Sequence, residues 1–131
     1  MALWLRYLIA FIVACHTVTY IPFGIVIPIA EKRWRGTSWL LGPALTQARL
    51  KALVMVLHLI AGIVIFACAV AISFASGWWR PLAIIGAAIG ILGFAVFWDG
   101  KTRLFAVEGG IGVIVSAVLL VSAIAFPRAF N

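Results

Sequence analysis

The stretch ALVMVLHLIAGIVIFACAVAISFA, residues 52–75, decides the fold of this chain. It contains no charged residue, and it is longer than the roughly 20 apolar residues that a helix needs to cross a hydrocarbon core of about 30 Å. Backbone polar groups in lipid must be satisfied within the segment, and no alternating barrel pattern appears. The stretch therefore predicts a transmembrane helix.

Three more runs are long enough to cross a bilayer. The four expected spans are residues 7–30, 52–75, 81–98 and 109–126. Pro43 is a suitable first residue for an earlier start of the second helix, and Pro22 predicts a kink near Val18. We therefore expect an all-α fold: an integral membrane four-helix transmembrane bundle with short connections, forming a single membrane domain over residues 1–131.

The composition of the whole chain agrees with this expectation. Of 131 residues, 66% are hydrophobic and 10% are charged, and the mean hydropathy is +1.26. An average soluble domain is about 25% charged. Small water-soluble domains bury the smallest fraction of their chain, so they have no room for this much apolar surface. The composition excludes an ordinary water-soluble domain.

The chain has a net charge of +7, and seven of its ten basic residues lie in two connections, residues 31–51 and 99–108, beside tryptophans. This placement predicts contact with anionic lipids of the bilayer and no nucleic-acid binding. Seven basic residues on one side against three on the other place both connections in the cytoplasm and both termini outside, in the cytoplasmic membrane of a prokaryote. The residues expected at the membrane interface are Trp34, Arg35, Trp39, Trp78 and Trp79.

Four polar side chains are the candidates for a polar path or a ligand site. His16 and Tyr20 lie four residues apart in the first span, His58 lies in the second span, and Glu108 precedes the fourth. Two interpretations stay open. The side chains are hydrogen-bonding contacts between helices, or they line a polar cavity, because ionisable groups in a span mark functional sites by default.

Two histidines among four helices also fit a haem held on both faces. Measured from the expected span ends, His16 lies roughly 13 Å below one surface and His58 about 10 Å from the other, which leaves an offset of about 7 Å. That offset disfavours one shared iron. No histidine–carboxylate cluster has metal-ligand spacing, and no catalytic triad or phosphate loop is present, so we predict no metal and no catalytic residue.

Small residues in the last two spans predict close packing of helices. They are Gly86, Gly90 and Gly93 in the third span, and Gly112 and Ser116 in the fourth.

The two cysteines, Cys15 and Cys68, are too few for a disulfide framework, and whether they meet stays open. IVAC, residues 12–15, resembles a bacterial lipoprotein cleavage box. The residues after Cys15 are still mostly apolar, so we expect an uncleaved span.

Many packing sites and few reactive groups favour a non-enzymatic multi-pass membrane protein. We expect a packing or accessory subunit of a membrane complex, or a homo-oligomer, whose partners are other membrane subunits or itself. Two alternatives stay open. One is a small transporter or channel with a polar path through His16, Tyr20, His58 and Glu108. The other is a redox subunit that binds haem or quinone. The sequence names no substrate, partner or cofactor.

Overall fold

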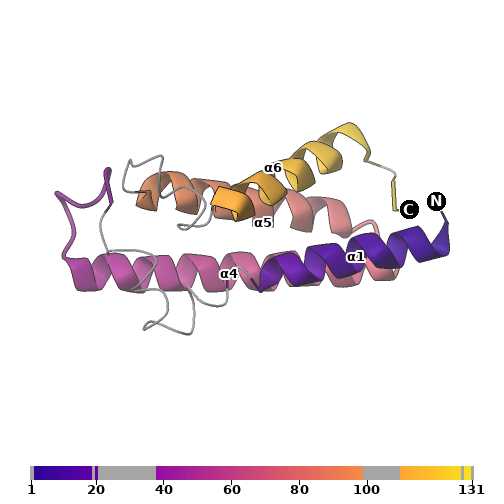
Figure 1. The fold of residues 1–131 in the computed structure, drawn as a ribbon, viewed down its shortest axis with the longest axis horizontal. Helices are drawn as coiled ribbons and strands as arrows, with labels where there is room; N and C mark the ends of the chain where they lie inside the picture. The colour runs from indigo at the N-terminus through magenta and orange to yellow at the C-terminus, as the bar shows by residue number, and fades with distance from the viewer. Residues whose placement is uncertain (1, 19, 21–37, 99–109, 128, 131) are drawn as a thin grey trace.

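The computed structural model describes residues 2–18, 20, 38–98, 110–127 and 129–130. Over these residues the chain is all-helical, with four helices and no strand, which confirms the predicted fold class to that extent (Figure 1). The helices are α1 (Leu3–Thr17), α4 (Gln47–Ser73), α5 (Trp79–Phe97) and α6 (Gly110–Ala125). Residues 21–30 of the first predicted span (7–30) and the candidate residues Trp34, Arg35 and Glu108 lie outside the described residues.

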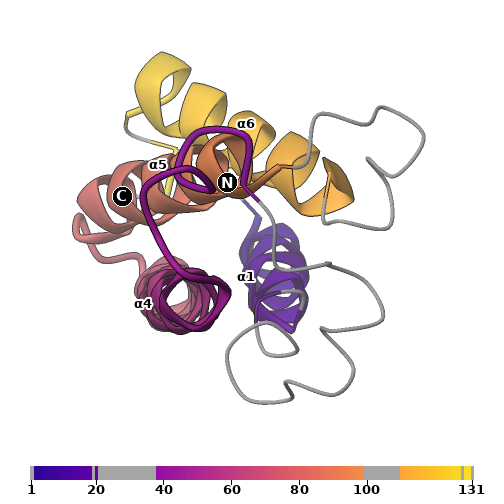
Figure 2. The ribbon, with the colours of Figure 1, turned by 90° about the vertical axis from the view of Figure 1, so that its left-hand side faces the viewer.

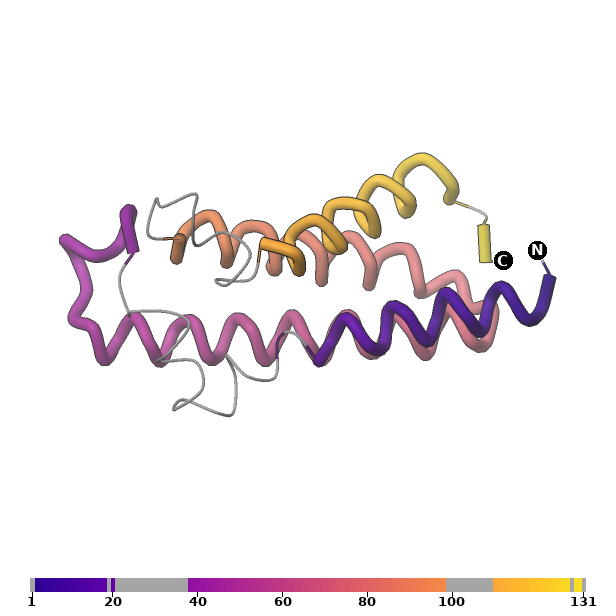
Figure 3. Tube along the Cα trace, in the orientation of Figure 1, coloured from indigo at the N-terminus to yellow at the C-terminus, as the bar shows by residue number. Residues whose placement is uncertain are grey.

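The four helices lie side by side, and each runs antiparallel to the one before it (Figures 1 and 2). α4 packs against both α1 and α5, and α5 packs against α6. Both ends of the chain lie at the same end of the bundle (Figure 3). α4 and α5 are long and apolar enough to cross a membrane, whereas α1 and α6 are shorter apolar helices within the described residues.

α4 begins earlier than the apolar stretch that predicts it, at Gln47. It does not begin at Pro43, which lies in a turn. That turn is organised by Ser38, whose hydroxyl oxygen accepts hydrogen bonds from the backbone N–H groups of Leu40 (3.3 Å) and Leu41 (2.9 Å). A serine that caps a turn in this way competes with continuous helix, so α4 starts only after the turn is complete.

The same turn covers the C-terminal end of α5. The last carbonyl groups of a helix have no partner within the helix itself. Here the Ser38 hydroxyl donates to the carbonyl oxygen of Val96 (2.5 Å), and the Trp39 indole N–H donates to that of Ala95. The Trp39 backbone N–H donates to the carbonyl oxygen of Trp98 (3.3 Å). The end of α5 is therefore closed by groups from a distant part of the chain.

At the opposite end, two neighbouring tryptophans have different surroundings. Trp78 is 71% exposed, whereas Trp79 is completely buried and packs edge-to-face on Phe130, with ring centroids 4.7 Å apart. The sequence analysis expects both tryptophans at the membrane interface, and in the structure the Trp79 side chain is buried inside the bundle. Beside it, Arg80 Nε donates to the carbonyl oxygen of Ala123 at 3.1 Å and ties the start of α5 to the end of α6.

Large apolar side chains cover the outside of the bundle, and the inside combines large residues such as Trp79, Ile65 and Ile72 with many small ones. The buried positions are rich in alanine and glycine, for example Ala61, Ala83 and Gly86. The exposed positions of all four helices carry large apolar side chains, including Phe11, Phe66, Leu92, Ile114 and Val118. A helix on the surface of a water-soluble protein has a polar outer face. In this chain the outer faces of the helices carry large apolar side chains instead.

Candidate functional site

A buried polar cluster, defined as His16, Tyr20 and Ser116, joins the end of α1 to the middle of α6. Ser116 is completely buried, and the other two residues are each 6% exposed. The Ser116 Oγ lies 2.8 Å from the Tyr20 hydroxyl oxygen and 3.2 Å from His16 Nε2. The Tyr20 hydroxyl is also 3.5 Å from His16 Nε2. The three groups therefore satisfy one another, as buried polar groups must.

The end of α1 positions this cluster. His16 lies in the last turn of α1, and the helix stops at Thr17, with Val18 still in helical conformation. The Thr17 hydroxyl donates to the carbonyl oxygen of Ala14, and the backbone N–H of Tyr20 donates to that of Thr17 at 3.0 Å. This backbone bond holds Tyr20 close to the end of α1, where its hydroxyl lies 3.5 Å from His16 Nε2.

Gly90 of α5 makes room for the cluster. A Cβ atom at this position would lie 3.3 Å from Ser116 Oγ and closer still to the Tyr20 hydroxyl. Only glycine lets the α5 backbone come this near to a hydrogen-bonded pair. The sequence analysis expects Gly90 to allow a close helix approach, and in the structure its neighbours are side chains of α6 and of the segment after α1.

The other small residues of α5 and α6 differ in how tightly they are surrounded. A Cβ at Gly86 would lie 2.7 Å from Ile65 Cγ1, so α5 and α4 approach closely there. A Cβ at Gly93 would lie 3.9 Å from the His58 ring, which is an ordinary contact. Gly112 is half-buried on α6.

His58 lies near the cluster on the neighbouring helix. Its Nδ1–H donates to the carbonyl oxygen of Val54 at 2.9 Å, one turn back in α4. The Tyr20 ring packs against both imidazoles, with centroids 5.8 Å from His58 and 5.2 Å from His16. The structure thus brings together three of the four predicted site residues. Glu108 is the fourth, and it lies outside the described residues.

This arrangement bears on the haem and metal alternatives. His16 Nε2, the nitrogen that an axial ligand would offer, is hydrogen-bonded to Ser116, and the Tyr20 ring lies against both imidazoles. As placed, the two histidines do not present a bis-histidine site. Within the described ranges no group of three His, Cys, Asp or Glu side chains could hold a metal ion.

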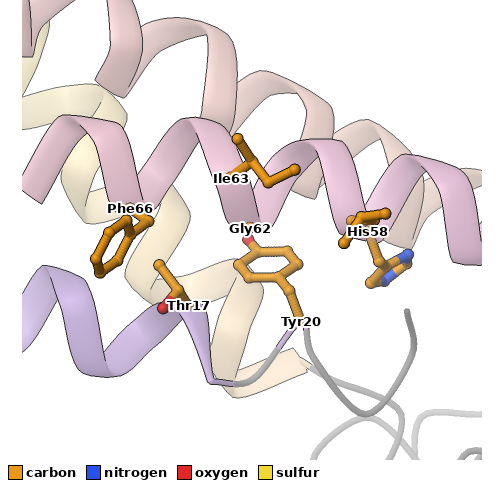
Figure 4. Close-up of a pocket in the computed structure, with 7 residues that line it drawn as sticks. Thr17, Tyr20, His58, Gly62, Ile63 and Phe66 are labelled. Carbon is orange, nitrogen blue, oxygen red and sulfur yellow. The ribbon is translucent and has the colours of Figure 1, made fainter. Parts of the chain in front are cut away.

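A pocket of about 320 Å³ lies between the end of α1 and the middle of α4 (Figure 4). The described residues that line it are Thr17, Tyr20 and His58, which have polar side chains, and Leu59, Gly62, Ile63 and Phe66. Three of these residues, Leu59, Ile63 and Phe66, are exposed on α4. Of these lining residues, the sequence analysis named only Tyr20 and His58. His58 and Gly62 are four residues apart, about one helical turn. This spacing is the sequence signal that could have predicted further lining residues on the same face of α4.

Neither cysteine is part of this site. Cys15 is exposed and Cys68 is buried, and both are free thiols. The Cys68 thiol donates to the carbonyl oxygen of Trp79, with a sulfur–oxygen distance of 3.4 Å. The two cysteines form no disulfide with each other.

No protein-family model, no curated protein and no solved structure matches this chain. Its function must therefore be inferred from the arrangement of its own residues.

Proposed function

We propose that this chain is a small, non-enzymatic integral membrane protein that crosses the bilayer with four helices and works as a subunit of a membrane assembly. The observation that carries the proposal is the large number of big apolar side chains exposed on the outer faces of all four helices. Each large apolar side chain left in water forgoes about 1.5–3 kcal/mol relative to burial. Acyl chains remove that penalty along every helix.

The lengths of the two longest helices support this placement. α4 has 27 residues and α5 has 19, which correspond to about 40 Å and about 28 Å at ~1.5 Å per residue. A hydrocarbon core of about 30 Å fits both, with the charged first turns of α4 in the headgroup region. The basic residues Arg49 and Lys51 lie in those turns.

The buried polar cluster supports a structural role over a catalytic one. Its hydroxyl and imidazole groups bond to one another across helices, and such bonds hold membrane helices together with about 0.6 kcal/mol each. All three acidic residues of the chain lie outside the described residues, so the described interior offers no carboxylate for acid–base chemistry.

The outer face of α6 supports assembly with another helix. Ile111, Ile114, Val118 and Val121 follow one another at intervals of three and four residues, and each is at least 55% exposed. This is the a/d spacing of helices that pair side by side. We define these four residues as the α6 seam.

The test begins with membranes from cells that express the chain. We expect the protein to stay in the pellet after alkaline carbonate extraction, and to migrate above the monomer mass in a mild detergent. Replacing Ile114 and Val118 with alanine should reduce the assembled fraction, whereas the same change at Ile85 and Leu92 on α5 should not. Release by carbonate, or a monomer without partners from the native membrane, would contradict the proposal. An absorption spectrum of the same sample tests for haem.

A transporter or channel is the second candidate, and it is favoured by the meeting of His16, Tyr20 and His58 in one region. Proton or solute flux into vesicles that contain the purified protein would test it. A flux that persists unchanged after substitution of His58 and Glu108 would remove this candidate.

A further inference from the structure

We propose that the end of the bundle where both chain ends lie binds the phosphate groups of anionic phospholipids through Arg6 and Arg80. This inference rests on the proposed membrane location, because headgroups surround that end only if the helices cross a bilayer. The sequence analysis expects anionic lipids at the basic connections 31–51 and 99–108. The support for a further site comes from the aromatic side chains, the charges and the two guanidinium groups at this end.

Exposed aromatic side chains at this end are typical of the headgroup level of a membrane. The first turns of α1 and α5 and the last turn of α6 lie there together (Figures 1 and 3). α1 and α5 both start with the pattern Trp-x-Arg, which comprises Trp4 and Arg6 in α1, and Trp78 and Arg80 at the start of α5. Trp4 is 69% exposed and Trp78 is 71% exposed. Because such tryptophans mark membrane–water interfaces, the arginines beside them are within reach of phosphate groups.

The positive charge at this end has no acidic partner among the described residues. The chain segments there, residues 2–6, 74–80 and 126–127, contain both arginines and no aspartate or glutamate. Neither arginine has an ion-pair partner in the described part of the chain, because all three acidic residues lie outside it. Guanidinium groups match the geometry of phosphate, and headgroup phosphate is the anion that a bilayer supplies.

Arg6 reaches this surface from the inward face of α1. Ala10 and Val13 follow it by four and seven residues and are buried, so the stem of Arg6 starts on the same face. Its Nε atom is buried and has no hydrogen-bond partner among the described residues. Its guanidinium carbon lies 5.5 Å from the ring centroid of Tyr7, whose side chain is exposed. The inner edge of the guanidinium group is thus covered by protein, and the terminal nitrogens beside the exposed ring are free to form two bonds to one phosphate.

Arg80 is anchored by its inner edge in a similar way. Its Nε donates to the carbonyl oxygen of Ala123 at 3.1 Å, and the residue is exposed. This bond fixes the guanidinium group at the end of α6 and uses neither of its terminal nitrogens. A partly buried charge attracts an anion more strongly than a fully hydrated one. We therefore expect Arg6, which is half-buried, to contribute more to phosphate binding than Arg80.

The experiment uses the full chain in dodecyl maltoside micelles, which contain no phosphate, after carbonate extraction has shown that it is membrane-integral. The probe is phosphatidylglycerol with a photoreactive diazirine near its headgroup, and the labelled positions are mapped by mass spectrometry of peptides. We expect saturable labelling of the first turns of α1 and α5. Arg6→Gln should raise the probe concentration for half-maximal labelling of α1 about fivefold, the factor expected for one basic residue at a lipid surface. Arg6→Lys, which keeps the charge, should raise it less.

Arg49→Gln is the matched control. It removes the same charge from an exposed position in the first turn of α4, at the opposite end of the bundle (Figure 1). This variant should leave the labelling of α1 unchanged. Diacylglycerol with the same diazirine has no phosphate, so it should label α1 without saturation.

Several results would overturn the inference while leaving the membrane proposal intact. They are no saturable labelling of α1, equal half-maximal concentrations for Arg6→Gln and the wild type, an equal loss in Arg49→Gln, or saturable labelling by diacylglycerol. Displacement of the probe by inorganic phosphate would assign the site to the free anion and would also overturn it. Release of the protein by carbonate would instead overturn the membrane proposal, and this inference with it.

Discussion

Replacing Gly90 with alanine tests the most crowded contact of the bundle. The new Cβ would lie against the Tyr20 hydroxyl and 3.3 Å from both Tyr20 Cζ and Ser116 Oγ. To accommodate it, Tyr20 must move and its hydrogen bond to Ser116 must lengthen or break. Overpacking costs about 1–3 kcal/mol and the lost bond about 0.6 kcal/mol, whereas alanine favours the helix by about 1 kcal/mol. We expect a net destabilisation of about 0.6–2.6 kcal/mol.

Gly93→Ala is the matched control, one turn along the same helix. Its Cβ would lie 3.9 Å from the His58 ring, so no neighbour must move. We expect this variant to be as stable as the wild type or up to about 1 kcal/mol more stable. The measurement is the unfolding midpoint in mixed micelles of a mild detergent and dodecyl sulfate, followed by far-ultraviolet circular dichroism.

A double-mutant cycle identifies the cause. Tyr20→Phe removes the hydroxyl that the new methyl group meets, so Gly90→Ala should cost at least about 1 kcal/mol less in that background. Equal stability of Gly90→Ala and Gly93→Ala would refute the reasoning, and so would strict additivity of Gly90→Ala with Tyr20→Phe.

Three further predictions use the same unfolding assay. Ser116→Ala removes the hydroxyl that both His16 and Tyr20 contact, and it should lower the free energy of unfolding by about 1–2 kcal/mol. No measurable change would show that the cluster does not join α1 to α6. Trp79→Ala should cost about 3–5 kcal/mol because its indole is completely buried, whereas Trp78→Ala should cost less than about 1 kcal/mol; similar losses would contradict their different burial. Arg80→Gln should cost about 1 kcal/mol through loss of its bond to the Ala123 carbonyl, and Arg80→Lys should not fully restore it, since the bond is made by Nε of the guanidinium group.

Helix class and approximate helix positions are predictable from hydropathy, but helix ends and helix rotation are not. The apolar stretch of α4 begins at Ala52, yet the helix begins at Gln47 because Arg49 and Lys51 continue the same backbone conformation. Trp79 was expected at the surface with Trp78. Neighbouring positions on a helix point about 100° apart, so one of the two can face the interior while the other faces outward.

The positions of the helix ends also explain why the two histidines were expected at different depths in the membrane. Their depths were measured from residues 7 and 52, whereas the helices begin at Leu3 and Gln47. Each histidine is therefore four or five residues, or about 6–7.5 Å, further from its own helix start, and in the structure the Tyr20 ring packs against both imidazoles. Ser116 was expected only as a packing residue, because its pairing with His16 depends on how α1 and α6 are rotated.

The closed end of α5 has a mechanical consequence. Ser38 and Trp39 bind three carbonyl groups at that end, and the chain then leads directly into α4. Axial sliding of α5 along α4 would break all three bonds together, so we expect relative motion of these helices to be a pivot about this end. The carbonyl groups at this end already have hydrogen-bond partners, so they need no water. A 19-residue helix can therefore end inside the hydrocarbon region of a thicker bilayer without leaving unpaired carbonyl groups in lipid.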